Sequence, residues 1–67
     1  MSDEGFGDLA AELDSLAERL ADRALALLRR AVDEPDHRSA GTERLVTRAR
    51  RSLEKAAALL READASG

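Results

Sequence analysis

The chain has 67 residues, enough for one small domain, with 11 basic and 14 acidic residues and a net charge of −3. It contains no cysteine, which excludes disulfides, thiolate nucleophiles and cysteine-containing zinc or iron–sulfur sites. The acidic balance argues against a general binder of nucleic acids or of anionic membranes. Alanine, leucine, arginine and glutamate are abundant while aromatic and β-branched residues are scarce, which predicts an all-α protein.

Residues 8–33 have the periodicity of an amphipathic helix, with 1–7 as a flexible N-terminus. The apolar positions that step by three and four are Phe6, Leu9, Leu13, Leu16, Leu20, Ala24, Leu27 and Ala31. A second apolar line widens this stripe toward the C-terminal half and consists of Ala21, Leu25, Leu28 and Val32. Asp8, or Gly7 before it, is the predicted N-cap, since acidic residues suit the first turn of a helix.

Residues 34–41 are predicted to form a loop, because Pro35 cannot continue a helix and Gly41 breaks the apolar pattern. Thr42 is the predicted cap of a second helix over 42–64, and 65–67 form a tail. The apolar positions of this helix are Leu45, Val46, Ala49, Leu53, Ala56, Leu59, Leu60 and Ala63. Two long helices and a short loop predict an antiparallel hairpin, in which Ala56 allows the helices to approach closely.

A hairpin of this kind buries a single seam, which leaves many of its leucines half covered. The second line of the first helix needs a surface that one partner helix does not provide. We therefore expect two copies to form a four-helix bundle, a homodimer that covers these side chains. The predicted core and interface residues are Phe6, Leu9, Leu13, Leu16, Leu20, Leu25, Leu27, Leu28, Val32, Leu45, Val46, Leu53, Leu59 and Leu60.

Charge is distributed unevenly between the two ends of the predicted hairpin. The loop end carries seven arginines against four acids, a net of +3, and the open end carries ten acids against four bases, a net of −6. Together they give the −3 of the whole chain. This asymmetry favours a second copy packed with its loop end against the open end of the first. Because salt screens such charges, they set orientation more than strength.

Four cations of the second helix, Arg44, Arg48, Arg51 and Lys55, step by four, three and four and share one face. One interpretation is a surface that contacts phosphates. The other, which we favour, is a solvated face balanced by acids of the first helix, of the same copy or its partner. Nucleic acid is not the expected partner, because no aromatic side chain is placed to stack on a base.

Candidate catalytic or metal-binding residues are few. The one cluster of possible ligands consists of Asp33, Glu34, Asp36 and His37. It includes a Glu-x-x-His spacing from Glu34 to His37, but Pro35 interrupts it and a polar surface turn explains the cluster better. No serine or threonine has a histidine or lysine arranged to activate it. We therefore expect no catalytic site, no metal, no cofactor and no small-molecule substrate.

These patterns predict a non-enzymatic interaction or assembly protein that associates with itself. The alternatives are an obligate small subunit of a larger protein, such as an enzyme that acts on nucleic acid, and a nucleic-acid accessory that uses the basic face. No stretch approaches the ~18–20 apolar residues of a membrane span, and residues 1–5 do not resemble a secretory signal. A cytoplasmic, soluble protein without membrane contact is expected.

Overall fold

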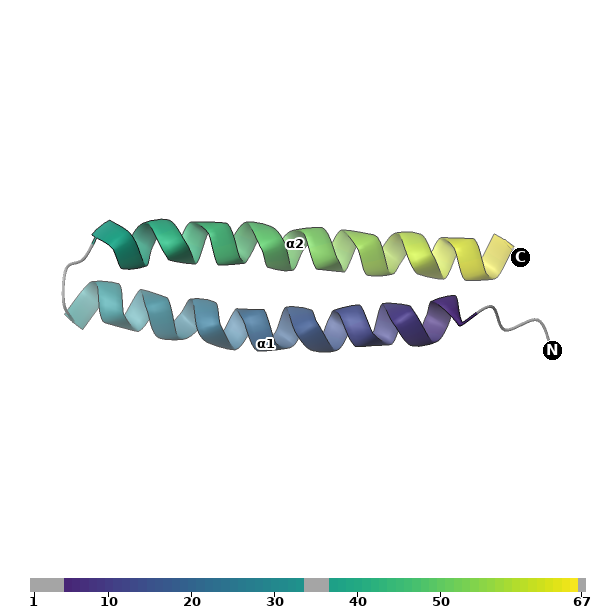
Figure 1. Cartoon of the computed structure of the whole chain (residues 1–67), viewed down its shortest axis with the longest axis horizontal. Helices are drawn as coiled ribbons and strands as arrows, with labels where there is room; N and C mark the ends of the chain where they lie inside the picture. Colours follow the sequence, from purple (N-terminus) through teal and green to yellow (C-terminus); the bar gives the residue numbers. More distant parts are fainter. Residues whose placement is uncertain (1–4, 34–36, 67) are drawn as a thin grey trace.

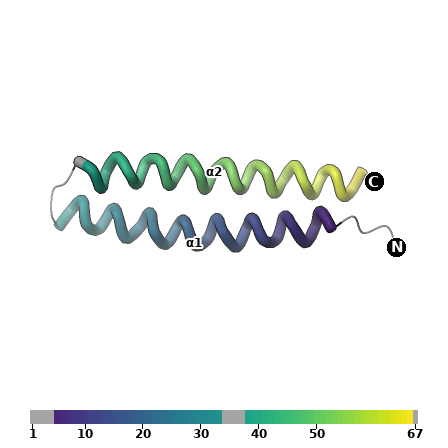
Figure 2. The backbone as a smooth tube through the Cα atoms, in the orientation of Figure 1, coloured from purple at the N-terminus to yellow at the C-terminus, as the bar shows by residue number. Residues whose placement is uncertain are grey.

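A computed structural model of the chain describes residues 5–33 and 37–66, and of His37 the backbone alone. These residues form two helices, α1 (Phe6–Asp33) and α2 (His37–Ser66). The helices run antiparallel, side by side along their whole length (Figure 1), and the backbone tube shows no interruption in either (Figure 2). The predicted all-α helical hairpin is confirmed.

The first helix begins two residues earlier than predicted. Gly5 has a φ of 80°, a left-handed conformation that glycine adopts at little cost. Its carbonyl oxygen accepts a 3.0 Å hydrogen bond from the amide of Leu9, which places Gly5 at the N-cap. Asp8 lies in the first turn of α1, where a carboxylate favours the helix dipole, and so it is not the cap. Residues 1–4 of the predicted N-terminus lie outside the described residues.

The second helix begins at His37, five residues before the predicted cap, so the prediction for Thr42 is wrong. Gly41 is inside the helix and does not end a loop, although glycine costs about 1 kcal/mol there relative to alanine. Burial of the first turns against α1 offsets this cost, because Ser39 is only 5% exposed. Residues 34–36 of the predicted loop and Gly67 of the predicted tail lie outside the described residues.

Small side chains line the seam between the helices. The buried residues of α1 are Ala10, Ala17 and Ala24, which repeat every seven positions, and those of α2 are Ser39 and Ala57. No large side chain is fully buried among the described residues. The close approach extends to the open end, where a methyl group added to Gly7 would lie 3.2 Å from Asp64 Oδ2.

The hairpin is a thin rod whose Cα atoms extend over 53 × 13 × 10 Å. Its accessible surface is 5253 Å², whereas a compact monomer of this mass, 7.2 kDa, exposes about 4,100 Å². The rod therefore leaves more surface in contact with water than a compact domain of the same mass.

Neither α1 nor α2 contains an apolar stretch long enough to cross a bilayer.

Candidate interaction surfaces

The alanine seam divides the hairpin into two sides. At about 100° per residue, a position one before or three after a seam alanine lies on one flank of α1, and a position one after lies on the other. Leu16 comes one position before Ala17 and Leu20 three positions after it, so both lie on the first flank. Leu25 comes one position after Ala24 and lies on the second flank. The same reasoning from Ser39 and Ala57 assigns the flanks of α2.

One flank of each helix gathers large apolar side chains, and the two flanks lie on the same side of the rod. We call this surface the leucine side. It consists of Phe6, Leu9, Leu13, Leu16, Leu20 and Leu27 of α1 and of Leu45, Val46, Leu53 and Leu60 of α2. Leu59, two positions after Ala57, lies instead on the outer edge of α2, nearly opposite the seam. A groove of about 370 Å³ joins the helices here, between Leu20 and Leu27 on α1 and Val46 on α2.

Most side chains of the leucine side stay in contact with water in the single chain. Leu9, Leu16 and Leu45 are exposed, and the other members of the surface are half-buried. Phe6 is one of the half-buried members and lies in the first turn of α1, at the open end. The leucine side is thus an apolar surface along both helices that the hairpin alone does not cover.

The opposite side, which we call the charged side, is held by polar contacts. Arg61 of α2 forms an ion pair with Asp14 of α1, which joins the two helices near the open end. Within α2, Arg50 Nη1 donates to Glu54 Oε2 over 3.1 Å and Thr47 Oγ1 donates to Glu43 Oε1 over 2.6 Å. These polar groups of the charged side therefore have partners within the same chain.

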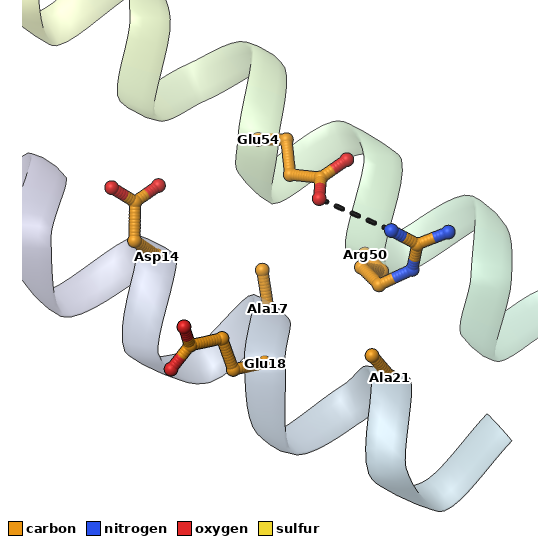
Figure 3. A pocket seen from close by; sticks show the side chains of 6 residues that line it. All are labelled: Asp14, Ala17, Glu18, Ala21, Arg50 and Glu54. Carbon is orange, nitrogen blue, oxygen red and sulfur yellow. Dashed lines mark hydrogen bonds and ion pairs between the residues drawn. The ribbon is translucent and has the colours of Figure 1, made fainter. Parts of the chain in front are cut away.

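A groove of about 280 Å³ runs along the charged side. In Figure 3 the methyl groups of Ala17 and Ala21 point into the space between the helices, while Arg50 and Glu54 meet above it. Glu18 lies along α1 at the wall of the groove. In the part of the chain that the structure describes, no group of carboxylates or histidines is arranged to hold a metal ion.

The second apolar line of α1 emerges on the charged side, so it does not widen the leucine stripe as the sequence suggested. Leu25, Leu28 and Val32 are all exposed, Val32 at 78%. They form a short patch beside Asp33, away from the rest of the predicted interface. Apolar spacing of three and four residues groups these positions with the leucine stripe. It does not show where α2 packs on α1, and this contact separates the two flanks of α1. The seven-residue repeat of Ala10, Ala17 and Ala24 is the signal that marks the division.

The basic stripe of α2, defined by Arg44, Arg48, Arg51 and Lys55, is fully on the surface. Arg48 is nine positions from both Ser39 and Ala57, which is half a rotation at about 100° per residue, so it lies directly opposite the seam. Within residues 5–33 and 37–66, none of the four cations forms an ion pair with an acid of α1.

Of the predicted candidate ligands, Asp33 is exposed at the end of α1, while Glu34, Asp36 and the side chain of His37 lie outside the described residues. The interface predicted from the sequence stays a prediction, because a single hairpin does not test contacts with a second molecule. Comparison of the chain with models of protein families, with curated proteins and with solved structures finds no match.

Proposed function

We propose that this chain is an assembly module whose role is binding rather than catalysis: two copies pack their leucine sides together and form a four-helix bundle. The observation that carries the proposal is the position of the large apolar side chains. The seam inside the hairpin takes small residues, and most of the leucines lie beside it on one surface, the leucine side. Helices that present leucines in this way cover them by packing against other helices.

The exposed area of the rod supports the same proposal. The accessible surface of 5253 Å² exceeds the roughly 4,100 Å² expected for a compact monomer by about 1,100 Å². A standard protein interface removes about 800 Å² from each partner. A second hairpin stacked on the leucine side would therefore bring the exposed area per chain into the usual range.

Charges favour an antiparallel pair. Arg23 and Arg30 border the leucine side in the loop half of α1, whereas Glu12 lies at the outer edge of α1 in its open half. In a face-to-face pair with loops at opposite ends, the two-fold axis lies across the rods, so α1 packs on its own symmetry mate. The acidic half of each α1 then faces the basic half of the other, which agrees with the net charges of the two hairpin ends.

A matched pair of substitutions tests the module. Leu16 is 42% exposed on the leucine side and Leu25 is 48% exposed on the charged side, so each costs the isolated hairpin a similar amount when it is replaced by aspartate. We expect the wild-type chain and Leu25→Asp to have twice the mass of 7.2 kDa by light scattering. Leu16→Asp should be monomeric, because dimerisation would bury its carboxylate.

Circular dichroism over a concentration series separates loss of association from loss of folding. A bundle that stabilises its own helices gains helicity and thermal stability as concentration rises. A folded wild-type monomer at micromolar concentration would contradict the proposal and would favour a larger protein as the partner of the leucine side. Equal behaviour of Leu16→Asp and Leu25→Asp would contradict the choice of surface.

A spin label on Ser66→Cys tests the orientation of the pair. Ser66 is exposed at the open end, nine positions after Ala57 and therefore opposite the seam, and the chain has no native cysteine. Antiparallel packing centred on the middle of α2 places the two labels about 40 Å apart along the rods, at 1.5 Å per residue. A parallel pair packs α1 of one copy on α2 of the other, so the labels lie at the same level at diagonal corners of the bundle, within about 30 Å.

A further inference from the structure

Two acids of α2, Glu43 and Glu54, are close in sequence to the cations of the basic stripe but form no ion pair with them. Glu43 accepts a hydrogen bond from Thr47, and Glu54 pairs with Arg50, both on the charged side. Asp14 of α1 is taken by Arg61. The stripe therefore combines four exposed cations at helical spacing, which repel one another, with no acid of the described chain at ion-pair distance.

The stripe also lies away from the surface that the proposed dimer would bury. It occupies the outer edge of α2, turned toward the charged side, and leaves the leucine side free. In the antiparallel pair α2 packs on its symmetry mate, so both stripes lie along the same edge of the bundle. That edge carries eight cations against the two copies of Glu62. The presence of eight cations on one edge rests on the proposed function, because it requires the dimer. The four cations of one stripe are present in the single chain.

We propose that this edge binds the phosphate backbone of double-stranded nucleic acid, without reading its sequence. The cations from Arg44 to Lys55 extend over about 16 Å at 1.5 Å per residue. A duplex carries one phosphate charge per about 1.7 Å of its axis when both strands are counted, so this length of duplex carries about ten phosphates, of which those on the near side face the stripe. Three of the four cations are arginines, whose planar guanidinium group binds phosphate through two parallel hydrogen bonds.

The absence of stacking groups decides between a duplex and a single strand. The chain has one aromatic residue, Phe6, and it lies on the leucine side at the open end, far along the rod from the stripe. Single-strand binding relies on aromatic platforms, whereas contacts to a duplex backbone need only cations. The net charge of −3 does not oppose this, because no acid of the described chain lies at ion-pair distance from the stripe.

Fluorescence anisotropy with a labelled 20-base-pair DNA duplex over a salt series tests the inference, with the mass measured in each buffer. The logarithm of affinity should fall linearly with the logarithm of salt, with a slope of about −7 for eight contacts. Arg48→Gln/Arg51→Gln should halve the slope to about −3.6 and weaken binding at least tenfold at low salt. The matched control, Arg19→Gln/Arg29→Gln, removes two exposed arginines of α1 and should bind as the wild type does.

The outcomes separate this inference from the proposed dimer. A dimer that does not bind the duplex, or that loses binding equally in the two double variants, would overturn the inference and leave the dimer intact. A monomer that binds with a slope of about −3.6 would support the single stripe and contradict the dimer. Binding to vesicles containing anionic phospholipid, without binding to the duplex, would overturn the inference in favour of a membrane surface.

Discussion

The leucine side and the charged side flank the same alanine seam, and they differ in how far the single chain satisfies them. On the charged side, Arg61 meets Asp14 across the helices and Arg50 meets Glu54 within α2. On the leucine side the groove between Leu20 and Val46 is open, and large side chains remain exposed along the rod. Polar contacts within the chain hold the charged side, whose exposed apolar patch is short, while the apolar surface of the leucine side extends along both helices.

This difference shows that, in a very small helical protein, different residues bring the helices together and provide the apolar area for burial. Alanines bring the helices close together but bury little area, and burial of apolar area is the main favourable contribution to folding. Most of the remaining apolar area lies on the leucine side. The fold of the hairpin and its association are therefore expected to be coupled, because the same side chains serve both.

The largest expected effect comes from a charge on the leucine side next to the seam. Leu20 and Leu53 are half-buried in the single chain and central in the proposed bundle. Leu20→Asp or Leu53→Asp should cost several kcal/mol, since a buried carboxylate without a partner loses its hydration. That is a large share of the 5–15 kcal/mol typical of whole domains.

The expected readout for these two variants is loss of both helicity and dimer mass at micromolar concentration. Leu28→Asp is the control, because Leu28 is exposed on the charged side. Retained helicity and mass in Leu20→Asp and Leu53→Asp would mean that the leucine side is not the interface, and the contrast between the two sides would fail.

Neighbouring alanines of α2 separate the seam from the leucine side. Ala57 is fully buried in the seam, whereas Ala56 is half-buried on the leucine flank. Ala57→Leu should overpack the seam and destabilise the protein by about 1–3 kcal/mol. Ala58→Leu should cost much less, because Ala58 is exposed on the charged flank, away from both the seam and the proposed interface, and urea unfolding of the two variants measures the difference. Equal destabilisation would place the seam elsewhere on α2.

A pair of glycine substitutions changes helix stability without favouring either side. Gly41 is inside α2 with no atom within 4 Å of an added methyl group, so Gly41→Ala should stabilise the protein by about 1 kcal/mol. Gly5→Ala should destabilise it by a similar amount, because alanine is strained at a positive φ. Thermal unfolding measures the midpoint temperature of each variant, which should rise for Gly41→Ala and fall for Gly5→Ala. A variant that forms more dimer without becoming more stable would contradict this prediction.

The smallest expected effect is on the charged side. The side chains of Arg61 and Asp14 are 51% and 46% exposed, and ion pairs at such positions contribute about 0.2–1 kcal/mol. Arg61→Ala should therefore lower stability by no more than that, with the loss reduced at high salt. A loss of several kcal/mol that salt does not change would show that the charged side holds the hairpin together as firmly as the apolar side chains do.

Sequence periodicity is sufficient to predict two antiparallel helices, because leucine and alanine spacing over long stretches outweighs local exceptions. It misplaces the start of α2, since the rule that glycine ends helices does not include the burial of Ser39 against α1. It also places Leu25 and Leu28 with Leu20 on one broad stripe, because spacing alone does not locate the neighbouring helix. The contacts of Glu43 and Glu54, which leave the basic stripe without acids, depend on side-chain directions that a sequence pattern does not contain.

The repeat of Ala10, Ala17 and Ala24 would allow the rod to be lengthened in fixed steps. Seven residues return a helix to nearly the same face and advance it by about 10.5 Å. Inserting seven residues into α1 and seven at the matching level of α2 should lengthen the rod by that step and keep its surfaces nearly aligned. Inserting five residues into each helix would instead rotate the segments beyond the insertion by about 140° and take their seam positions out of contact.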